Sequence, residues 1–598
     1  MRHHIPTLLF RDYLTSQRDK KFLLVIDNLW ASDFHFWEML RVPLLVGGDG
    51  SKVLITTRYE RACHIPERID RPSLTGLKDE DCWQLIQSLA LPQGIDCHMG
   101  LIPIGEEIAR RCYGSPMAAK ALGAVLNRTS ADEWSSVLSE MQALKDDFNG
   151  VVLASLKISY HHLRYHLKQC FGYCSIFPNG YVFERDQVVR YWMAEGLIEP
   201  EGRRRLEAVG MKYFDDLLWR SFFEKVPICD KGQIEHYRIP SLMHNLASIV
   251  SEYEFRGLQS GKRVLESNGA HQAQVRYASF IQPSDKRTLN LECIEPYSNL
   301  RALKFSHECN NGVVLLNSTP AHFFCNFMYL RVLDMSDSDL EQVPDSVGKL
   351  IHLRFLGLSY TKIKTLPEEI CGLSNLQTLE LKGCSQLESL PEGLQRLINL
   401  RHLDFHLDWE DISDSTEVAI PQGIGELEDL QTLSRFNVAS AKGQQCNILE
   451  LKDLKLRGDL CILNLEKVPT GHAKNANLQG KNFIEKLMLR WHSSALTDGL
   501  LQQQSEEHLP WLLNLRIENV HGDTMSLPEG FPSLEDLTLL NLNFLGRLTL
   551  GNEMPKLKKL YVSDCSKLQE LVIHRNLYDK FERGNLLSSL RIICVPQD

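Results

Sequence analysis

A repeat of 23 to 24 residues limits what this chain can fold into more than any other sequence feature. Aligned leucines at Leu330, Leu353, Leu376 and Leu400 are spaced by 23, 23 and 24 residues. A second leucine follows three residues later in each block, and a proline recurs at one turn of three blocks: Leu333, Leu356, Leu379, Leu403, Pro344, Pro367 and Pro391. This period predicts a leucine-rich-repeat solenoid with one short strand per turn.

The repeat becomes looser toward the C-terminus but continues. Residues 429–433 (DLQTL) and 485–489 (EKLML) fit the pattern, and Leu534 and Leu557 are again 23 apart. The solenoid is therefore expected over residues 295–598, with each turn burying its leucines against its neighbours. Polar and aromatic residues stand between the leucines on the predicted concave face, which suits protein recognition or, alternatively, a solvated surface: Arg331, Val332, Arg354, Phe355, Gln377, Thr378, Arg401 and His402.

The size and composition indicate several globular domains. A chain of 598 residues is too long for one core, and 43% hydrophobic and 24% charged residues are ordinary for globular proteins. A net charge of -10 argues against general nucleic-acid binding. The 16 cysteines lack CxxC spacing, so free thiols in a reducing compartment are expected, in the cytoplasm or nucleus. No apolar run is long enough for a membrane span, and the first residues lack a secretory leader.

Residues 1–70 are predicted to form a strand, a short helix over 34–40 and a second strand. In the first segment, KFLLVIDNLW (21–30), five apolar residues precede Asp27, as in a strand buried on both faces of a parallel sheet. An acid at the carboxyl end of such a strand can hold Mg²⁺ beside a phosphate. The alternative is a structural strand followed by a solvated aspartate.

The second segment, SKVLITTR (51–58), ends in Thr56, Thr57 and Arg58, which suit a polyphosphate. However, no GxxxxGK[ST] phosphate loop occurs in the sequence, and the glycine-rich segment 47–52 has the spacing of a turn. A phosphate loop supplies the backbone N–H groups and the lysine that bind the phosphates. Nucleotide binding is therefore expected to be weak or absent.

The middle of the chain is predicted to be helical. Helices are expected at 77–89, 104–112 and 117–126 within a helical region over 71–150, where Pro116 alone is ordinary helix-start punctuation. Residues 151–250 are predicted to form one helix over 155–174, a helix ending near Gly196 and a strand over 233–239. Such a helix-plus-hairpin unit can bind DNA, but the candidate recognition helix over 186–193 is not basic. Residues 251–294 are interpreted as a linker with some strand.

The order of these segments resembles the plant nucleotide-binding leucine-rich-repeat (NB-ARC) disease-resistance proteins. KFLLVIDNLW is similar to the kinase-2 (Walker B) motif of that family, SKVLITTR to its sensor-1 strand and CYGSPMAAKALG to its GLPLA motif. Residues 156–198 are similar to its winged-helix signature almost throughout. The resemblance implies an ADP/ATP switch with bound Mg²⁺, in which the repeats restrain the switch and sense pathogen effectors.

The same resemblance assigns individual residues. Asp27 matches the Mg²⁺-coordinating acid, and Arg58, after Thr57, matches the arginine that senses the γ-phosphate. Asn28 stands where the family has a second aspartate, and an amide cannot accept the proton of an attacking water, so hydrolysis should be weak or absent. Pro116 and the preceding Gly114 match the segment that packs on the nucleotide.

The end of the winged-helix segment departs from the family pattern. By spacing, the family's Met-His-Asp motif falls on Ile239, Pro240 and Ser241. In another register His244 is the candidate nucleotide ligand, but Asn245 replaces the aspartate.

The sequence thus predicts a multidomain α/β plus α plus solenoid chain. Its parts are a partial P-loop NTPase-like α/β domain (1–70), a helical ARC1 subdomain (71–150), a winged-helix ARC2 domain (151–250), a linker (251–294) and the leucine-rich repeats (295–598). It resembles an N-terminally truncated, non-enzymatic immune receptor with an incomplete nucleotide site. Its expected partners are a pathogen effector or a guarded host protein, with intramolecular or homo-oligomeric contacts. The alternatives are a working ADP/ATP switch whose P-loop lies in a longer gene product, and a leucine-rich-repeat adaptor.

Overall fold

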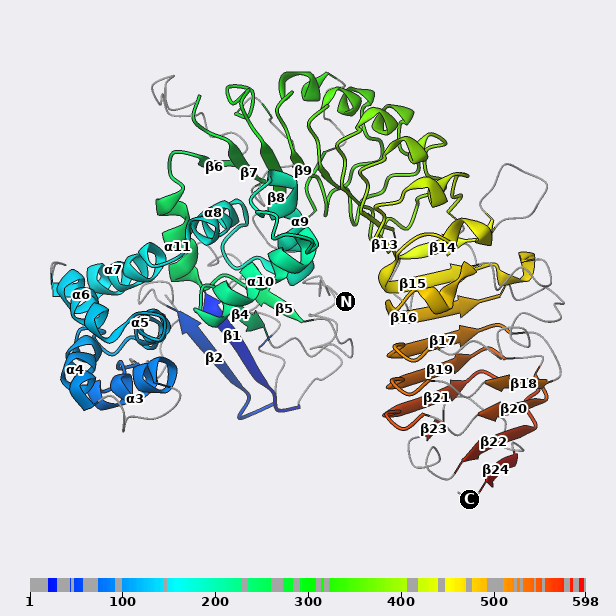
Figure 1. The fold of residues 1–598 in the computed structure, drawn as a ribbon, viewed down its shortest axis with the longest axis horizontal. Helices are drawn as coiled ribbons and strands as arrows, with labels where there is room; N and C mark the ends of the chain where they lie inside the picture. Colours follow the sequence, from blue (N-terminus) through cyan, green and yellow to red (C-terminus); the bar gives the residue numbers. More distant parts are fainter. Residues whose placement is uncertain are drawn as a thin grey trace. The chain divides into compact units, whose positions relative to one another are not determined.

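A computed structural model gives the fold of the chain (Figure 1). It describes residues 20–29, 44, 48–57, 74–91, 99–142, 148–226, 235–259, 273–282, 291, 293–307, 313–316, 322–405, 418–438, 447–468, 476–491, 509–520, 524–527, 531–542, 545–550, 554–574, 581–583 and 591–595. The chain divides into two compact units, Met1–Lys78 and Asp79–Asp598. The helix predicted over 34–40 lies outside the described residues.

The first unit contains a pair of parallel strands, β1 (Leu23–Leu29) and β2 (Lys52–Thr57). The two predicted strands are thus confirmed. The expectation that the first is buried on both faces is wrong, because Leu23 is 68% exposed and Val25 is 54% exposed. The physical reason is that these strands form a sheet of two in the part of the chain that the structure describes, so no further strand extends the sheet there.

The second unit opens with helices, as the sequence predicts. They are α3 (Asp79–Ala90), α4 (Ile102–Arg110), α5 (Pro116–Leu126) and α6 (Ala131–Gln142). An acidic first turn favours the start of α3, since negative charge stabilises a helix N-terminus. Their apolar faces meet in one core that includes Ile86, Leu122 and Trp134.

A winged-helix arrangement follows. Its elements are α7 (Phe148–His161), α8 (Tyr165–Tyr173), β3 (Val182–Glu184), α9 (Arg185–Glu195), α10 (Leu206–Trp219), β4 (Glu224–Val226), β5 (His236–Arg238) and α11 (Ser241–Val250). The strands form an antiparallel sheet in the order β3-β5-β4. The single helix predicted over 155–174 is wrong, because Arg164 has extended backbone angles and separates α7 from α8. Leu163 and Leu167 still enter one buried core.

Leucine-rich repeats make up the remainder, and their first strands form one parallel sheet of eight (Figure 1). The strands run in chain order: β6 (Phe255–Gln259), β7 (Tyr277–Gln282), β8 (Ala302–His307), β9 (Val332–Asp334), β10 (Phe355–Gly357), β11 (Thr378–Glu380), β12 (His402–Asp404) and β13 (Thr432–Leu433). The predicted leucines occupy one register position, with Leu333 beside Leu356, Leu379 and Leu403. A strand-forming turn every 23 to 24 residues is confirmed.

The interpretation of residues 251–294 as a linker with some strand is corrected by this sheet, because the strands there belong to the repeats. Strand β6 pairs in register with β7, which pairs in register with β8, and Leu258, Phe280 and Ile294 belong to the same buried cluster as the repeat leucines. These two strands lack the L-x-x-L-x-L spacing, so the periodicity could not identify them. They belong to the repeat sheet because their apolar side chains extend its core.

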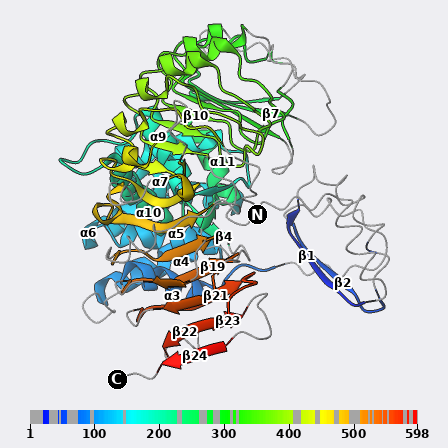
Figure 2. The same ribbon diagram turned by 90° about the vertical axis from the view of Figure 1, so that its right-hand side faces the viewer.

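The looser repeats form two further parallel sheets (Figure 2). One contains β14 (Arg435–Asn437), β15 (Arg457–Leu463), β16 (Phe483–Arg490), β17 (Asn514–Glu518), β19 (Asp536–Leu540), β21 (Lys559–Ser563) and β23 (Phe581–Arg583). The other contains β18 (Thr524–Leu527), β20 (Arg547–Leu550), β22 (Glu570–His574) and β24 (Arg591–Val595). One apolar core runs from Leu258 to Ile573, as expected for stacked repeats.

Two composition-based expectations can be compared with the described residues. The sequence predicts free thiols, and Cys170 and Cys174, one helical turn apart, are free and buried. Among the helices in the described ranges, none has the length and apolar character that crossing a membrane requires.

Candidate functional site on the concave face of the repeats

The nucleotide-site candidates of the first unit lie on its two strands. Asp27 and Asn28 are within β1 rather than after it, and Thr57 is the last residue of β2, paired with Leu29. Parallel pairing puts the carboxyl ends of both strands at one edge, where ligands of open α/β sheets bind. Arg58 lies outside the described residues.

The other candidates lie in the second unit. Gly114 has a φ of 72° and Pro116 is the first residue of α5, whose N-cap Ser115 accepts a hydrogen bond from the Ala118 N–H at 3.3 Å. Both residues thus have a local role in a turn and a helix start. His244, on α11, lies with Nε2 2.8 Å from the carbonyl oxygen of Phe177, and burial lowers its pKa.

These residues do not assemble a metal centre on their own. Within the ranges that the structure describes, no three His, Cys, Asp or Glu side chains converge as a metal site requires. The assignment of Asp27 to Mg²⁺ therefore remains a prediction, as do the nucleotide roles of Asn28, Thr57, Arg58, Gly114, Pro116 and His244.

The concave face of the repeats carries a much more developed set of contacts. The winged-helix elements α9 and α10 pack against strands β7 to β12, a contact that we call the clamp. Val332 and Phe355, predicted to face a partner or solvent, are fully buried in one apolar cluster with Tyr191 and Trp192. The ring of Tyr191 lies 4.5 Å from that of Phe355, centroid to centroid. The predicted recognition face is thus occupied by another part of the same chain.

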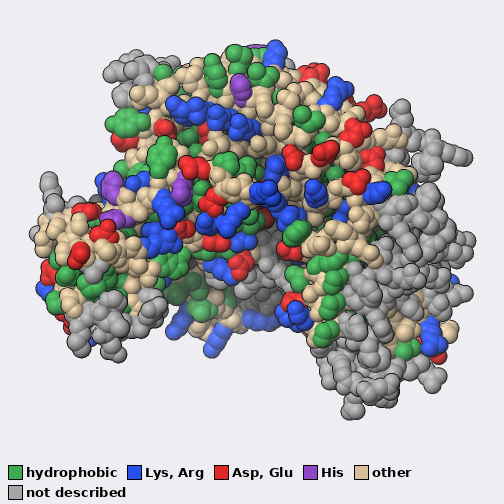
Figure 3. Space-filling model, in the orientation of Figure 1, with side chains coloured by type: hydrophobic (Ala, Val, Ile, Leu, Met, Phe, Trp, Pro, Cys, Tyr) green, Lys and Arg blue, Asp and Glu red, His purple; other side chains and the backbone are tan. Residues whose placement is uncertain are grey.

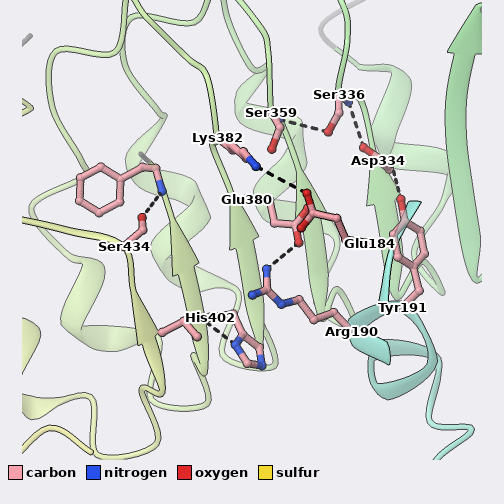
Figure 4. Close-up of polar contacts among 12 residues, drawn as sticks. Glu184, Arg190, Tyr191, Asp334, Ser336, Ser359, Glu380, Lys382, His402 and Ser434 are labelled. Carbon is pink, nitrogen blue, oxygen red and sulfur yellow. Dashed lines mark hydrogen bonds and ion pairs between the residues drawn. The ribbon is translucent and has the colours of Figure 1, made fainter. Parts of the chain in front are cut away.

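A buried acid anchors one side of the clamp (Figure 4). The Tyr191 hydroxyl and the Lys304 ammonium both donate hydrogen bonds to Asp334, and the Ser336 N–H donates at 3.0 Å. Burial alone would raise the pKa of Asp334, but the Lys304 charge and these hydrogen bonds outweigh it, so the pKa is lowered. Asp334 is therefore held ionised against α9.

A second acid on the same face meets Arg190 (Figure 4). Arg190 Nη1 lies 2.9 Å from Glu380 Oε1, with both side chains largely buried, and Lys382 Nζ lies 3.6 Å from Glu184 Oε1. Burial raises the pKa of Glu380 to about 7, although Arg190 opposes the shift. Asp404 occupies the next register position, so Asp334, Glu380 and Asp404 form an acidic row.

The C-terminus of α9 meets arginines instead. Glu195 Oε1 lies 3.5 Å from Arg301 Nη1 and 3.6 Å from Arg331 Nη1, and Arg354 donates to the Ala194 carbonyl at 3.5 Å. Cations at a helix C-terminus also interact favourably with the helix dipole. Burial raises the pKa of Glu195 to about 7, against the lowering effect of Arg331 and Arg301.

Glu207, in the first turn of α10, makes the most complete ion pair of the clamp. Its carboxylate accepts from Arg401 at both oxygens, with Nε–Oε1 at 2.8 Å and Nη2–Oε2 at 3.1 Å. Arg205 Nη2 is 3.5 Å and His402 Nε2 is 3.4 Å from the same carboxylate. Burial would raise the pKa of Glu207, but the nearby His402 ring and the Arg401 guanidinium lower it overall. Burial lowers the pKa of His402 to about 4.

The arginines of the clamp share one position in successive repeats. Each residue at this position donates its backbone N–H to the carbonyl of the preceding one, at 2.6 to 2.8 Å, from Arg276 to Arg457. The ladder reads Arg276, Arg301, Arg331, Arg354, Gln377, Arg401, Gln431 and Arg457. We call its arginines the arginine row. Each arginine of the row lies just before a strand of the sheet, as Arg331 does before Val332. The residues of the acidic row lie two positions further along the strand, as Asp334 does after Val332.

Sequence reasoning found the repeat side of this site but missed its winged-helix side. Arg331, Val332, Arg354, Phe355, Arg401 and His402 were predicted at the concave face, whereas Glu184, Arg190, Tyr191, Glu195 and Glu207 were not singled out. One signal was available. An arginine recurs at one repeat position, so acids elsewhere in the chain were candidate partners for it.

Known protein families match the first unit, the winged helix and the repeats of this chain. Family models match at residues 8–96 (NB-ARC domain), 176–247 (disease resistance protein winged helix domain), 314–487 (leucine-rich repeat region) and 448–565 (R13L1/DRL21 LRRs). Disease resistance protein RGA2 of Solanum bulbocastanum is 33% identical over 79% of this chain and 44% of its own length. Disease resistance protein RPP13 of Arabidopsis thaliana is 26% identical over 90% of this chain and 62% of its own length. The chain spans about half the length of the curated relatives that it matches.

An NB-ARC segment, a winged helix and leucine-rich repeats in one chain define a class of multidomain proteins. The matches to all of these parts, and relatives named as resistance proteins, place this chain in that class. It belongs to the plant nucleotide-binding leucine-rich-repeat disease-resistance family.

Proposed function

We propose that this chain acts in plant innate immunity as a receptor whose repeats hold the winged helix in a resting position. The observation that carries the proposal is the clamp, in which α9 and α10 occupy the concave face that the repeats would use for recognition. Signalling would require the clamp to open. The proposed partners are a pathogen effector or a guarded host protein, and the proposed location is the cytoplasm or nucleus.

The contacts of the clamp suit a two-state restraint. Glu380 and Glu207 are buried and paired with Arg190 and Arg401 across the contact. Removing one partner of a buried pair costs about 3–5 kcal/mol, because the other charge stays buried without compensation. When the whole clamp opens, both partners return to water together, so opening is far less costly than leaving one charge unpaired.

A nucleotide site built from the residues of this sequence would lack a phosphate-binding loop. Asp27 would hold Mg²⁺ and Gly114, Pro116 and His244 would lie near ADP or ATP, by resemblance to the family alone. The sequence contains no GxxxxGK[ST] loop, and such loops supply the N–H groups that bind phosphates. We therefore propose weak or absent nucleotide binding, and no enzymatic role for this chain.

Hydrogen exchange of the full chain tests the clamp. In the Arg190→Glu variant, the acids of the acidic row repel the new carboxylate, and the amides of α9 should exchange faster while the repeat core stays protected. Arg185→Gln is the matched control, because Arg185 lies on the same helix but pairs with Asp215 on the exposed side. Unchanged exchange of α9 in Arg190→Glu would contradict the restraint.

A further inference from the structure

Two adjacent turns of the repeats bring a thiol and an amine together. Cys325 lies in the 3₁₀ turn η4 (Phe323–Asn326), and Lys349 is the last residue of η5 (Asp345–Lys349) in the next repeat. The Lys349 ammonium donates a hydrogen bond to the Cys325 sulfur, with Nζ and Sγ 3.3 Å apart. Within the described part of the chain, Lys349 forms no ion pair with a carboxylate. Its nitrogen is therefore directed at sulfur.

This thiol is accessible to a small oxidant. Cys325 is only partly buried and Lys349 is exposed, whereas most cysteines in the described ranges are buried. The other partly buried thiol among them, that of Cys293, packs against the apolar core of the repeats. Reactive cysteines in proteins are partly exposed and lie beside a cationic side chain. Cys325 has both properties.

The chain contains a second, similar pair that serves as an internal comparison. Cys371 occupies the position of Cys325 two repeats further on, in η6 (Glu368–Gly372), and Arg396 follows it as Lys349 follows Cys325. Burial raises the pKa of Cys371 to about 12, although the charge of Arg396 opposes the shift. The guanidinium of an arginine also stays protonated, so it offers no nucleophilic nitrogen. This second pair therefore lacks both a reactive thiol and a reactive amine.

We propose that Cys325 and Lys349 are a modification site, at which a peroxide produces a covalent sulfur–nitrogen bridge (a sulfenamide) between adjacent repeats. Hydrogen peroxide transfers one oxygen atom to the Cys325 sulfur, which gives a sulfenic acid and one water. The Lys349 ammonium then releases a proton to solvent, and its nitrogen attacks the sulfur. The sulfur's hydroxyl leaves as water with a second proton from that nitrogen. Sulfur is thus oxidised by two electrons, which the peroxide accepts.

A thiol reductant reverses the bridge. The thiolate attacks the Cys325 sulfur, the bond from sulfur to nitrogen breaks, and the Lys349 nitrogen takes up protons as an ammonium. A second thiol then attacks the mixed disulfide and releases Cys325 as a free thiol. The modification is therefore reversible under reducing conditions.

The bridge changes an exposed surface of the repeats. Met328, Tyr329 and Ile351 are exposed apolar side chains that directly follow the two turns, and the Tyr329 ring lies parallel to that of His352 at 6.4 Å between centroids. The face of the molecule in Figure 3 likewise shows hydrophobic side chains at the surface among charged ones. The bridge ties η4 to η5 and removes the positive charge of Lys349. It therefore fixes the spacing of the turns that carry these apolar side chains.

The proposal does not depend on the proposed function. Cys325 and Lys349 lie on the 3₁₀ turns of the repeats and not on the concave strands that the clamp uses. Failure of the bridge would leave the clamp untouched, and failure of the clamp would leave the bridge untouched.

The test treats the full chain with hydrogen peroxide and maps its tryptic peptides by mass spectrometry. The peptides that contain Cys325 and Lys349 should appear joined, with a mass lower by two hydrogen atoms than in the reduced chain. Trypsin should no longer cleave after Lys349, and a thiol reductant should restore cleavage. Cys371 should stay reduced in the same sample, because its thiol is buried.

Two variants separate the bridge from simple oxidation of the thiol. Cys325→Ser should abolish the joined peptide. Lys349→Arg keeps the positive charge but offers no nucleophilic amine. In that variant Cys325 should still be oxidised, and dimedone, which captures sulfenic acids, should label it without a joined peptide.

Hydrogen exchange measures the structural effect of the bridge. Amides of η4 and η5 should exchange roughly tenfold more slowly in the oxidised chain, because a crosslink restricts local opening, and peroxide should not slow them in Lys349→Arg. Several results would overturn the proposal: sulfenic or sulfinic acid at Cys325 with Lys349 still cleaved, a disulfide or a different lysine at Cys325, a joined peptide that persists in Lys349→Arg, or equal oxidation of Cys371.

Discussion

Glu207 and Arg401, 194 residues apart in the sequence, form a bidentate ion pair between the first turn of α10 and the repeat sheet. The pair links the winged helix to the repeats through the strongest type of side-chain hydrogen bond. It also shows why the concave face cannot be regarded as an open surface in this conformation.

Glu207→Gln should weaken the clamp by about 3 kcal/mol, because Arg401 then keeps its charge in a largely buried place without a carboxylate. The measurement is the exchange rate of α10 amides, together with urea unfolding of the full chain. Glu201→Gln is the control, since Glu201 pairs with Lys212 at an exposed site. It should leave both readouts close to those of the unmodified chain, because solvent screens an exposed pair. Equal effects of the two variants would show that the buried pair has no special role.

A charge exchange across the clamp tests the Arg190–Glu380 pair. Arg190→Glu and Glu380→Arg should each speed the exchange of α9, since each leaves like charges facing each other. The double variant should recover a large part of the protection, because the pair is restored with reversed polarity. A coupling energy near zero in this double-mutant cycle would mean that the two residues do not stabilise the contact together.

The sequence predicts the repeat side of the clamp, but it does not predict which part of the chain packs against that side. The leucine period fixed the repeat strands, since each leucine in that register has to enter the core, and helical spacing located α3, α5 and α9. The same logic named Val332, Phe355 and Arg401 as concave residues. It could not say that α9 covers them, because Arg190 and Glu380 are 190 residues apart and no local pattern encodes such a pairing.

Other differences between the sequence predictions and the structure also have a physical origin. The strands β6 and β7 carry apolar residues without the leucine spacing, so they resemble an irregular linker. The apolar run of β1 predicts burial on both faces, but burial also depends on neighbouring elements, and periodicity says nothing of those. The nucleotide assignments of Asp27 and Pro116 rest on resemblance, and they remain predictions.

The clamp should weaken as pH rises through about 7. Burial raises the pKa of both Glu195 and Glu380 to about 7, above the ordinary value of 4.5 that each regains on release. The clamped state therefore binds more protons between these values, so its extra stability is present at low pH and is lost as pH rises through the raised pKa. The surrounding groups are Arg301, Arg331, Arg354 and Tyr277 at Glu195, and Arg190, Asp334 and Asp404 at Glu380.

Pulse proteolysis of the full chain between pH 6.5 and pH 8.5 measures this effect, and the fraction of open clamp should increase with pH. The double variant Glu195→Gln, Glu380→Gln should flatten the profile, because the amides mimic the protonated carboxyls. His402 has the opposite pH dependence. Burial in the clamp lowers its pKa from 6.5 to about 4, so the stability that neutral His402 gives to the clamp is lost as pH falls through that range. A profile that is flat above pH 6.5 in the unmodified chain would refute the role of the two glutamates.

Gly196→Ala should destabilise the end of α9 by about 1 kcal/mol. Gly196 ends the helix with a φ of 85°, a conformation that side chains disfavour, and an added Cβ would lie 3.4 Å from Arg354 Nη1. Thermal unfolding of the full chain measures the change. Gly372→Ala is the control, because that glycine has no positive φ and no heavy atom within 4 Å of an added Cβ. If both variants unfold alike, the left-handed turn does not contribute.

The 598-residue chain should show no Mg²⁺-dependent binding of ADP at micromolar concentration in calorimetric titration. Phosphate affinity in such folds comes largely from backbone N–H groups of a GxxxxGK[ST] loop, which is absent from the sequence. Asp27 could still contribute a carboxylate to a metal, but a single carboxylate binds Mg²⁺ weakly without substrate phosphates held beside it. Titration of the Asp27→Ala chain is the control for any heat that appears. Micromolar binding that Asp27→Ala abolishes would show that the site works without that loop, and the chain would then be a nucleotide-driven switch.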